Sequence, residues 1–455
     1  FMSQQDSKKV HFVSLGCPKN LVDSEIMLGT LKADGFSGTE SADEADAIVV
    51  NTCGFIEDAK KESIEKILEM AKNKEDGSLK KLVVAGCLTQ RYQQELIDGL
   101  PEADLFIGSG QFQNINTILR DSFDGNKKKD FFNLPTYLQE ADTPRINSQL
   151  SHRAYLKISE GCKKRCSFCA IPLIRGHLQS RTVDNIVSEA KLLVAGGVKE
   201  LIVISHDFTD YGWDLRKDGL DGNTCYQLLD RLSKESGAEW IRVLYLYPDG
   251  VDQDILQLIK DRDCLVEYFD MPLQHINDEM LKVMNRRMSK KEIQSVLTQI
   301  RATMPSAVIR TQFIVGFPGE TEEQFTELLD FIEEQRFDRV GCFKFSPEED
   351  TKASTLPNQI SEEVKEERFQ RVMALQQEIS REKNQQLVGK VIDVMVEGLS
   401  EETDLLLQGR NSQQAPDIDG VTLINDGQAN VGEIVKVEIT ESHDYDLVGR
   451  IIEAE

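Results

Sequence analysis

The sequence contains 455 residues, 40% of them hydrophobic, which is enough for two or three domains with separate cores. No apolar run approaches the roughly 20 residues of a membrane helix, and the polar start FMSQQDSKK is no signal peptide, so we expect a cytoplasmic protein. Nine cysteines then favour metal binding or catalysis over disulfides. The formal charge of −25 disfavours nucleic-acid binding and favours a basic partner, unless it serves solubility alone.

Residues 1–125 are predicted to form an α/β domain with a doubly wound parallel sheet. Near-continuous apolar strands alternate with helical patterns, the strands at residues 10–16, 46–51 and 80–86 and the helices at 23–35 and 58–73. This alternation is typical of a parallel sheet covered by helices on both faces. The polar stretch DGNKKKD (124–130) then suggests a linker.

Each of these three strands leads directly into a cysteine: Cys17, Cys53 and Cys87. Ligands of doubly wound sheets bind at the carboxyl ends of the strands, and neighbouring strands would bring the three thiols to one edge. A single buried cysteine is usually a small hydrophobic residue. Three cysteines at equivalent strand ends instead indicate an iron–sulfur cluster with three thiolate ligands and one open iron.

Residues 148–380 are predicted to form an open, partial (β/α)6 barrel, with functional groups at the carboxyl ends of its strands. The strand candidates lie at residues 154–159, 200–205, 241–247, 267–273, 308–316 and 339–345. A long charged helix follows at residues 362–387.

The first of these strands runs into SEGCKKRCSFCAIPLIRG (159–176), where Cys162, Cys166 and Cys169 form a C-x3-C-x2-C array. Three thiolates can hold a cubane iron–sulfur cluster and leave one iron open to a small molecule. A closed zinc site is the alternative, but it needs four ligands, and His177 would have to complete it. The compact triplet at a strand end favours the cluster.

Residues 385–455 are predicted to form a small antiparallel β-barrel, because short strands alternate with glycine and polar turns. From Val388 to Glu455 there are four basic and fifteen acidic residues. A barrel that gripped RNA would need lysine and arginine on its face. An acidic barrel would attract a basic protein, unless it is a solvated domain that merely packs on the central barrel.

The cysteine triplet, with Phe168 before its last cysteine, resembles that of radical S-adenosylmethionine (SAM) enzymes. In that family the open iron chelates SAM, and an electron from the cluster splits the sulfonium to give a 5′-deoxyadenosyl radical. Such a radical is needed when an unactivated C–H bond offers no proton that a side chain could remove at neutral pH. The cofactor supplies this chemistry, and the protein positions it.

The whole chain resembles the methylthiotransferases, which join this N-terminal domain to a radical SAM barrel and a C-terminal TRAM barrel. The resemblance implies a transferase with two 4Fe–4S clusters and SAM, in which the cluster on Cys17, Cys53 and Cys87 carries sulfur. One SAM donates a methyl group, another generates the radical, and the substrate carbon captures the methylthio group. Proteins that donate electrons and sulfur are implied partners. A non-enzymatic iron–sulfur or zinc scaffold that binds RNA is the alternative from another class.

Two branches of this family compete. One modifies a tRNA adenosine beside the anticodon. The other adds the methylthio group to the β-carbon of an aspartate in small-subunit ribosomal protein S-twelve, giving 3-methylthioaspartate. The chain is similar to the second branch in several stretches: LGCPKNLVDSEIM (15–27), NTCGFIEDAKKES (51–63) and residues 155–162, 240–250, 271–275, 316–323 and 409–420. Two positions depart from the family pattern and concern its pocket: His206, where glutamine is usual, and Met288, where glycine is common.

A few other residues keep two interpretations. GFPGETEEQF (316–325) has capping-box spacing at its helix start and could also contact SAM at the barrel mouth. His275 either faces the cavity or is a hydrogen-bonded structural residue. Arg175 and Arg181 either bind a carboxylate of SAM or substrate or form surface ion pairs. The remaining cysteines show no mutual spacing and are predicted not to be ligands: Cys225, Cys264 and Cys342.

Overall fold

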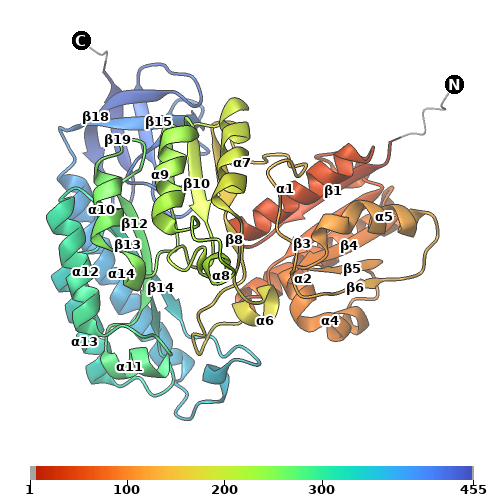
Figure 1. Ribbon diagram of the computed structural model, residues 1–455, viewed down its shortest axis with the longest axis horizontal. Helices are drawn as coiled ribbons and strands as arrows, with labels where there is room; N and C mark the ends of the chain where they lie inside the picture. The colour runs from red at the N-terminus through yellow and green to blue at the C-terminus, as the bar shows by residue number, and fades with distance from the viewer. Residues whose placement is uncertain (1–6, 453–455) are drawn as a thin grey trace.

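The computed structural model describes residues 7–452, which form three consecutive units (Figure 1). They are a parallel α/β sheet, a partial β/α barrel and a closed β-barrel, so the fold class expected from the sequence is confirmed. No helix in this described range is both long and apolar enough to cross a membrane. The polar start at residues 1–6 and two members of the acidic count, Glu453 and Glu455, lie outside the described residues.

The N-terminal unit alternates strands and helices: β1 (Lys9–Ser14), α1 (Pro18–Ala33), β2 (Ser37–Gly38), β3 (Ala47–Thr52), α2 (Glu57–Ala71), α3 (Asn73–Asp76), β4 (Lys81–Gly86), α4 (Cys87–Gly99), β5 (Leu105–Gly108), α5 (Ile115–Phe123) and β6 (Asp130–Phe131). The six strands are parallel in the order β2-β1-β3-β4-β5-β6. Strand order therefore reverses direction between β1 and β3, which is the position where doubly wound sheets bind ligands. The stretch DGNKKKD is not a linker but the loop that leads from α5 into β6, because β6 pairs with β5.

The central unit contains the following elements: β7 (Arg153–Lys157), β8 (Ser159–Glu160), α6 (Ile171–Arg175), β9 (Gln179–Ser180), α7 (Val183–Ala195), β10 (Glu200–Ile204), α8 (Trp213–Lys217), α9 (Cys225–Glu235), β11 (Trp240–Val243), α10 (Gln253–Lys260), β12 (Tyr268–Gln274), α11 (Asp278–Val283), α12 (Lys290–Thr303), β13 (Val308–Val315), α13 (Glu322–Gln335), β14 (Arg339–Lys344) and α14 (Glu362–Gln385). The main strands pair in parallel as β7-β10-β11 and β12-β13-β14. The two sheets meet through a parallel bridge between Ile241 and Leu265, so the six strands form one open barrel wall.

The third barrel strand is shorter than the sequence predicts. The apolar run reaches Tyr247, but β11 ends at Val243. Tyr245 has a φ of 64°, in the left-handed region that residues of a regular strand rarely adopt. Its backbone N–H donates to the Asp270 carboxylate at 3.0 Å instead of to a neighbouring strand. Residues 244–247 therefore form an irregular segment at the barrel mouth.

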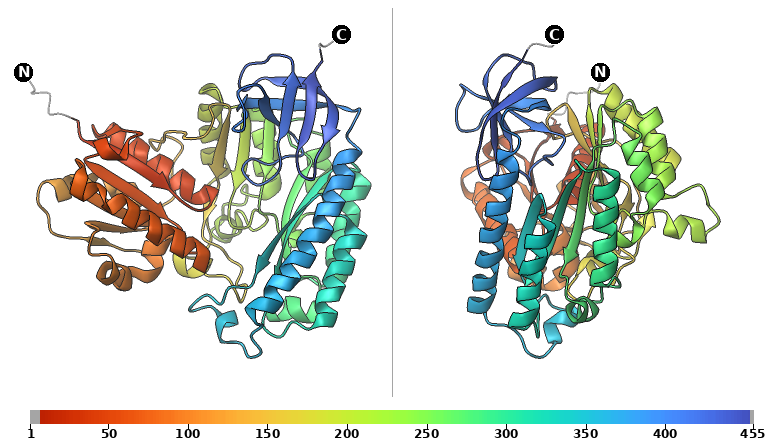
Figure 2. Two further views of the ribbon diagram at one scale, coloured as in Figure 1. Left: turned by 180° about the vertical axis from the view of Figure 1, so that it is seen from behind. Right: turned by 90° about the vertical axis from the view of Figure 1, so that its left-hand side faces the viewer.

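The C-terminal unit is a closed barrel of five strands: β15 (Val391–Leu399), β16 (Leu407–Asn411), β17 (Thr422–Asp426), β18 (Ile434–Ser442) and β19 (Leu447–Ile451). Four of its pairs are antiparallel, and β17 pairs with β19 in parallel. Helix α14 runs along the central unit toward this barrel (Figure 2).

The C-terminal barrel covers the amino-terminal ends of the central strands. Arg410 bonds to Glu200 at the start of β10 at 2.6 Å. The hydroxyl group of Tyr268, which begins β12, donates to Asp419 at 2.6 Å. The opposite, carboxyl-terminal ends of the strands therefore remain for the functional site, where the N-terminal unit lies.

Candidate active site

The first group of cysteines lies at the carboxyl ends of three neighbouring strands. Cys17 directly precedes α1 and follows β1, Cys53 follows β3, and Cys87 begins α4 immediately after β4. The strands end in register, because Ser14 pairs with Asn51 and the next residue of β3, Thr52, pairs with Gly86. The structure therefore brings the three cysteines to one edge of the sheet, as the strand pattern predicts.

Glycines allow the three cysteine loops to approach one another. Gly16 has a φ of +89°, and a Cβ added there would lie 2.8 Å from the Cβ atom of Cys53. A Cβ on Gly54 would lie 2.7 Å from the Cα atom of Leu88, directly after Cys87. Contacts this short exclude any side chain, so both glycines are needed for the thiols to converge.

Burial and charge shape the chemistry of these thiols. Burial, with smaller contributions from Cys17 and Cys53, raises the pKa of Cys87 to about 12. Arg175 opposes this effect, because its Nη2 group donates to the Cys87 sulfur at 3.2 Å. A metal that bound here would displace the thiol protons, and Arg175 would compensate part of the thiolate charge.

The second group of cysteines lies on the loop after β8. The Cys162 N–H donates to the Gly176 carbonyl at 3.2 Å, and the Cys169 N–H donates to the Cys166 carbonyl at 3.2 Å. Phe168 packs edge-to-face against Phe317 of the GFPGETEEQF stretch, with ring centroids 6.4 Å apart. Phe168 and the GFPGETEEQF stretch therefore hold the cysteine loop at the barrel mouth together.

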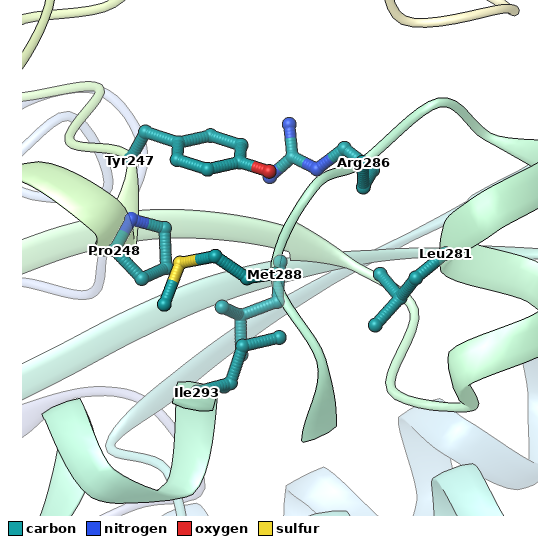
Figure 3. A pocket seen from close by; sticks show the side chains of 7 residues that line it. Tyr247, Pro248, Leu281, Arg286, Met288 and Ile293 are labelled. Atoms are coloured by element: carbon teal, nitrogen blue, oxygen red, sulfur yellow. The ribbon is translucent and has the colours of Figure 1, made fainter. Parts of the chain in front are cut away.

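Two of these thiols are partly buried, and a cation lies beside the third. Burial raises the pKa of Cys162 and of Cys169 to about 12. The Arg286 guanidinium group lies 3.7 Å from the Cys166 sulfur and stacks over the Tyr247 ring, 4.2 Å from its centroid. Figure 3 shows this pair beside Met288, one of the two positions that depart from the family pattern. Met288 therefore lines an apolar pocket next to the cysteine loop.

The donor atoms suit clusters better than single metal ions. Within residues 7–452, no three Cys, His, Asp or Glu side chains converge closely enough to hold one metal ion. A closed zinc site needs such convergence of four ligands. A cubane cluster does not, because each thiolate ligates a different iron. Two sets of three thiols with nearby arginines therefore fit two iron–sulfur clusters.

Helix α6 lies between the N-terminal sheet and the barrel (Figure 1) and connects the two cysteine groups. Cys87 packs in one apolar cluster with Ala170 and Ile174, and Ala170 is the residue after Cys169. The Ser109 hydroxyl group, from the end of the N-terminal sheet, donates to the Ile174 carbonyl at 2.8 Å. The segment from Ala170 to Ile174 therefore lies next to both cysteine groups.

Buried ion pairs join the two units around this segment. Asp23 of α1 lies 2.5 Å from the Lys157 ammonium group and 2.5 Å from the Arg175 guanidinium group. Lys157 also pairs with Glu160. Arg181 is buried as well, 2.5 Å from Glu189. Neither interpretation of the two arginines from the sequence is therefore correct: both form buried ion pairs within the protein rather than surface pairs or free anion sites.

Other residues singled out in the sequence are structural. His275 is fully buried, 3.0 Å from Glu320, and its Nδ1 atom accepts from the Ile276 N–H at 2.9 Å. Thr321 and Gln324 form the capping box at the start of α13 that their spacing predicts. These contacts stabilise the segment between β13 and α13.

The structure also places His206 and the three cysteines that are predicted not to be ligands. Burial and the charges of Lys19 and Arg175 lower the pKa of His206 well below its usual value, so this histidine is neutral. The cysteines predicted not to be ligands lie away from both groups, with Cys225 donating to the Phe208 carbonyl at 3.1 Å, Cys264 half-buried near Ser233 and Cys342 in the barrel core.

The sequence analysis missed Lys19. This residue follows Cys17 by two positions on α1, and only 5% of it is exposed. Its ammonium group lies 3.2 Å from the centroid of the Tyr245 ring at the barrel mouth. A lysine at the start of a helix is unremarkable in a sequence. Only the packing of the two units shows that Lys19 lies between them, against Tyr245 of the central unit.

Three family models match the chain in order. They are an uncharacterized protein family, UPF0004, at residues 9–108, the radical SAM superfamily at residues 156–332 and the TRAM domain at residues 388–452. Among solved structures, the radical SAM methyltransferase TsrM from Kitasatospora setae covers 74% of this chain and 73% of its own, with a TM-score of 0.54 and 13% identity. At that identity the likeness shows the fold alone.

Curated relatives are much closer in sequence. A protein of Bdellovibrio bacteriovorus named "Ribosomal protein uS12 methylthiotransferase RimO" is 65% identical over 447 residues, covering 98% of each chain. A protein of the same name from Geotalea uraniireducens is 48% identical and covers 99% of this chain and 100% of its own. The chain therefore belongs to the RimO methylthiotransferases, a family of radical SAM enzymes that carry two 4Fe–4S clusters.

Proposed function

We propose that this enzyme transfers a methylthio group to the β-carbon of an aspartate in ribosomal protein uS12, giving 3-methylthioaspartate. The observation that carries the proposal is the meeting of two three-cysteine groups from separate units at α6, where Cys87 packs against Ala170 and Ile174. Two centres that open into one interior can act on one substrate carbon without releasing an intermediate. The name shared by the curated relatives supports the substrate.

We assign the radical SAM cluster and SAM to Cys162, Cys166 and Cys169. The sulfur-bearing cluster is assigned to Cys17, Cys53 and Cys87. When bound, the first centre with SAM supplies a radical that can abstract hydrogen, and the second supplies the sulfur. We likewise assign residues 1–125, 148–380 and 385–455 to the three domains, with β6 extending the first of them to Phe131, and each of these ranges contains one of the matched family segments.

The protein's own residues orient the two centres and exclude water between them. Asp23 ties α1 to Lys157 at the end of β7 and to Arg175 at the end of α6. On another side of the interface, Glu348 accepts from Arg91 of the N-terminal unit at 2.8 Å. Ion pairs buried in this way are strongly directional and resist sliding of one unit over the other. A closed site matters because a carbon radical would otherwise react with oxygen or with small-molecule hydrogen donors such as thiols.

The acidic C-terminal barrel supports a basic protein as the substrate rather than tRNA. Several of its carboxylates bind the central unit, among them Asp417 with Arg153 and Asp419 with Tyr268. Others remain exposed: Asp393, Glu401, Glu402, Asp404, Asp426, Glu433 and Glu441. This exposed set would repel a phosphate backbone and attract a ribosomal protein. We place the reaction in the cytoplasm, with separate proteins donating electrons and sulfur.

Mass spectrometry tests the proposal. Reconstituted enzyme, SAM and a reductant are incubated with purified uS12 or with tRNA, and a strain that lacks the gene provides both substrates unmodified. We expect the protein to gain one methylthio group on an aspartate and the tRNA to gain none. Modified tRNA with unchanged uS12 would favour the tRNA enzyme of the same fold.

A further inference from the structure

We propose that Lys19 binds the side-chain carboxylate of the substrate aspartate. This inference rests on the proposed function and adds the residue by which the site recognises an acidic side chain. Lys19 reaches the shared interior from α1, and its ammonium group lies over the Tyr245 ring at 3.2 Å. Within residues 7–452 that group forms no ion pair and no hydrogen bond, and the acidic groups that act on it, Cys17, Asp270 and Glu160, do so only at longer range. A cation that is 95% buried without an anion is unfavourable unless a ligand supplies one.

The lack of a partner is specific to Lys19. Other buried cations of this interior have carboxylates: Lys157 and Arg175 share Asp23, Arg145 bonds to Glu25 and Glu189, and Arg310 bonds to Asp270. Apart from Cys17, the acidic groups that act on Lys19 are already occupied, because Glu160 pairs with Lys157 and Asp270 accepts from Arg310 and from the Tyr245 N–H. Lys19 is thus available to an incoming anion.

The position of Lys19 suits the proposed reaction. It follows Cys17 by two residues, and the ring beneath it belongs to Tyr245, at the barrel mouth. Tyr245 has a φ of 64°, which turns its ring out of the regular strand pattern and under Lys19. In aspartate the carboxyl carbon is bonded directly to the β-carbon, so an ion pair at Lys19 would fix the reacting carbon between the two centres. Adenine has no carboxylate and would gain nothing from this contact.

A matched set of variants tests the inference. Holoenzyme is prepared as wild type, Lys19→Met, Lys19→Arg and Lys32→Met, an exposed lysine near the end of the same helix. Dissociation constants are measured for uS12 and for uS12 with asparagine at the modified position. Wild type, Lys19→Arg and Lys32→Met should bind the aspartate form about 10-fold to 100-fold more tightly, the range of a charged hydrogen bond. Lys19→Met should bind both forms equally, with iron content and SAM affinity as in wild type.

Each outcome has one meaning. A Lys19→Met enzyme that still prefers aspartate as strongly as wild type would overturn the inference. Loss of SAM affinity with the preference intact would also overturn it, because Lys19 would then bind the carboxylate of SAM. If Lys19→Met loses iron, Lys19→Gln replaces it in the same comparison with Lys19→Arg. A wild-type enzyme that adds no methylthio group to uS12 would refute the proposed function instead, which separates the two failures.

Discussion

Arg175 connects the two halves of the site through one guanidinium group. It donates to the Cys87 sulfur at 3.2 Å, to Asn20 at 3.2 Å and to Asp23 at 2.5 Å, all on the N-terminal unit. Burial disfavours the charge of Arg175, but the pKa of this group lies well above its usual value because Asp23 and the surrounding acidic groups stabilise the cation. The residue therefore stays charged and orients the neighbouring thiol.

Arg175→Met should destabilise the interface by about 3–5 kcal/mol, because it leaves Asp23 and Glu160 buried with one cation fewer. The expected readout is a lower midpoint of thermal unfolding and faster proteolysis between the units. Arg371→Met serves as the control, since its ion pair with Glu322 is exposed and worth about 0–1 kcal/mol. Equal effects of the two substitutions would show that the buried pair does not hold the units together.

Substitutions in the two cysteine groups should impair different steps of the reaction. Cys166→Ala should abolish SAM cleavage, measured as 5′-deoxyadenosine, because it removes a ligand of the proposed radical SAM cluster. Cys53→Ala should keep part of that cleavage and stop methylthio transfer. Cys264→Ala is the control, because this half-buried cysteine lies away from both groups and should leave both activities unchanged. Full transfer by Cys166→Ala and Cys53→Ala would contradict the assignment of roles.

Helix α1 shows how far a sequence can predict a site. The strand before it and the glycine–cysteine turn are local features, so the cysteine at its start could be found from the pattern. The roles of Lys19 and Asp23 could not, because both depend on how α1 packs against the central unit. Hydrophobic periodicity carries no information on contacts between units.

Among the strands, too, those with a local apolar pattern could be predicted and those shaped by distant contacts could not. β3 and β4 are almost wholly buried and follow the apolar runs closely. β11 ends early, because the left-handed backbone of Tyr245 is set by its contact with Asp270 rather than by its own β-propensity. β6 was missed because it has two residues and no apolar run.

Replacing Arg410 by methionine should weaken the packing of the C-terminal barrel on the central unit. Burial acts to raise the pKa of Glu200, but Arg410 and Arg242 lower it to about 2, so Glu200 is ionised at neutral pH. Removing Arg410 leaves Glu200 and Glu397 buried with fewer cations, a loss of about 3–5 kcal/mol. We expect limited proteolysis near residue 388 to accelerate. Arg450→Met, an exposed residue of the same barrel, should cleave at the wild-type rate.

The charge of the whole molecule argues for a basic substrate. Replacing Glu401, Glu402 and Asp404 by lysine should slow association with uS12, and raising the salt concentration should reduce the difference from wild type. The same change at exposed Glu95, Asp98 and Glu102 on the N-terminal unit is the control. Stopped-flow association rates give the comparison. Equal slowing by both triplets would mean that total charge, and not the C-terminal barrel, steers the substrate.

The proposed reaction requires two clusters in one chain. Iron and acid-labile sulfide in anaerobically prepared enzyme measure this most directly, and we predict about eight of each per chain, with about four of each after Cys17, Cys53 and Cys87 are replaced by alanine. Four irons per chain in the wild type, or zinc in place of iron, would contradict it.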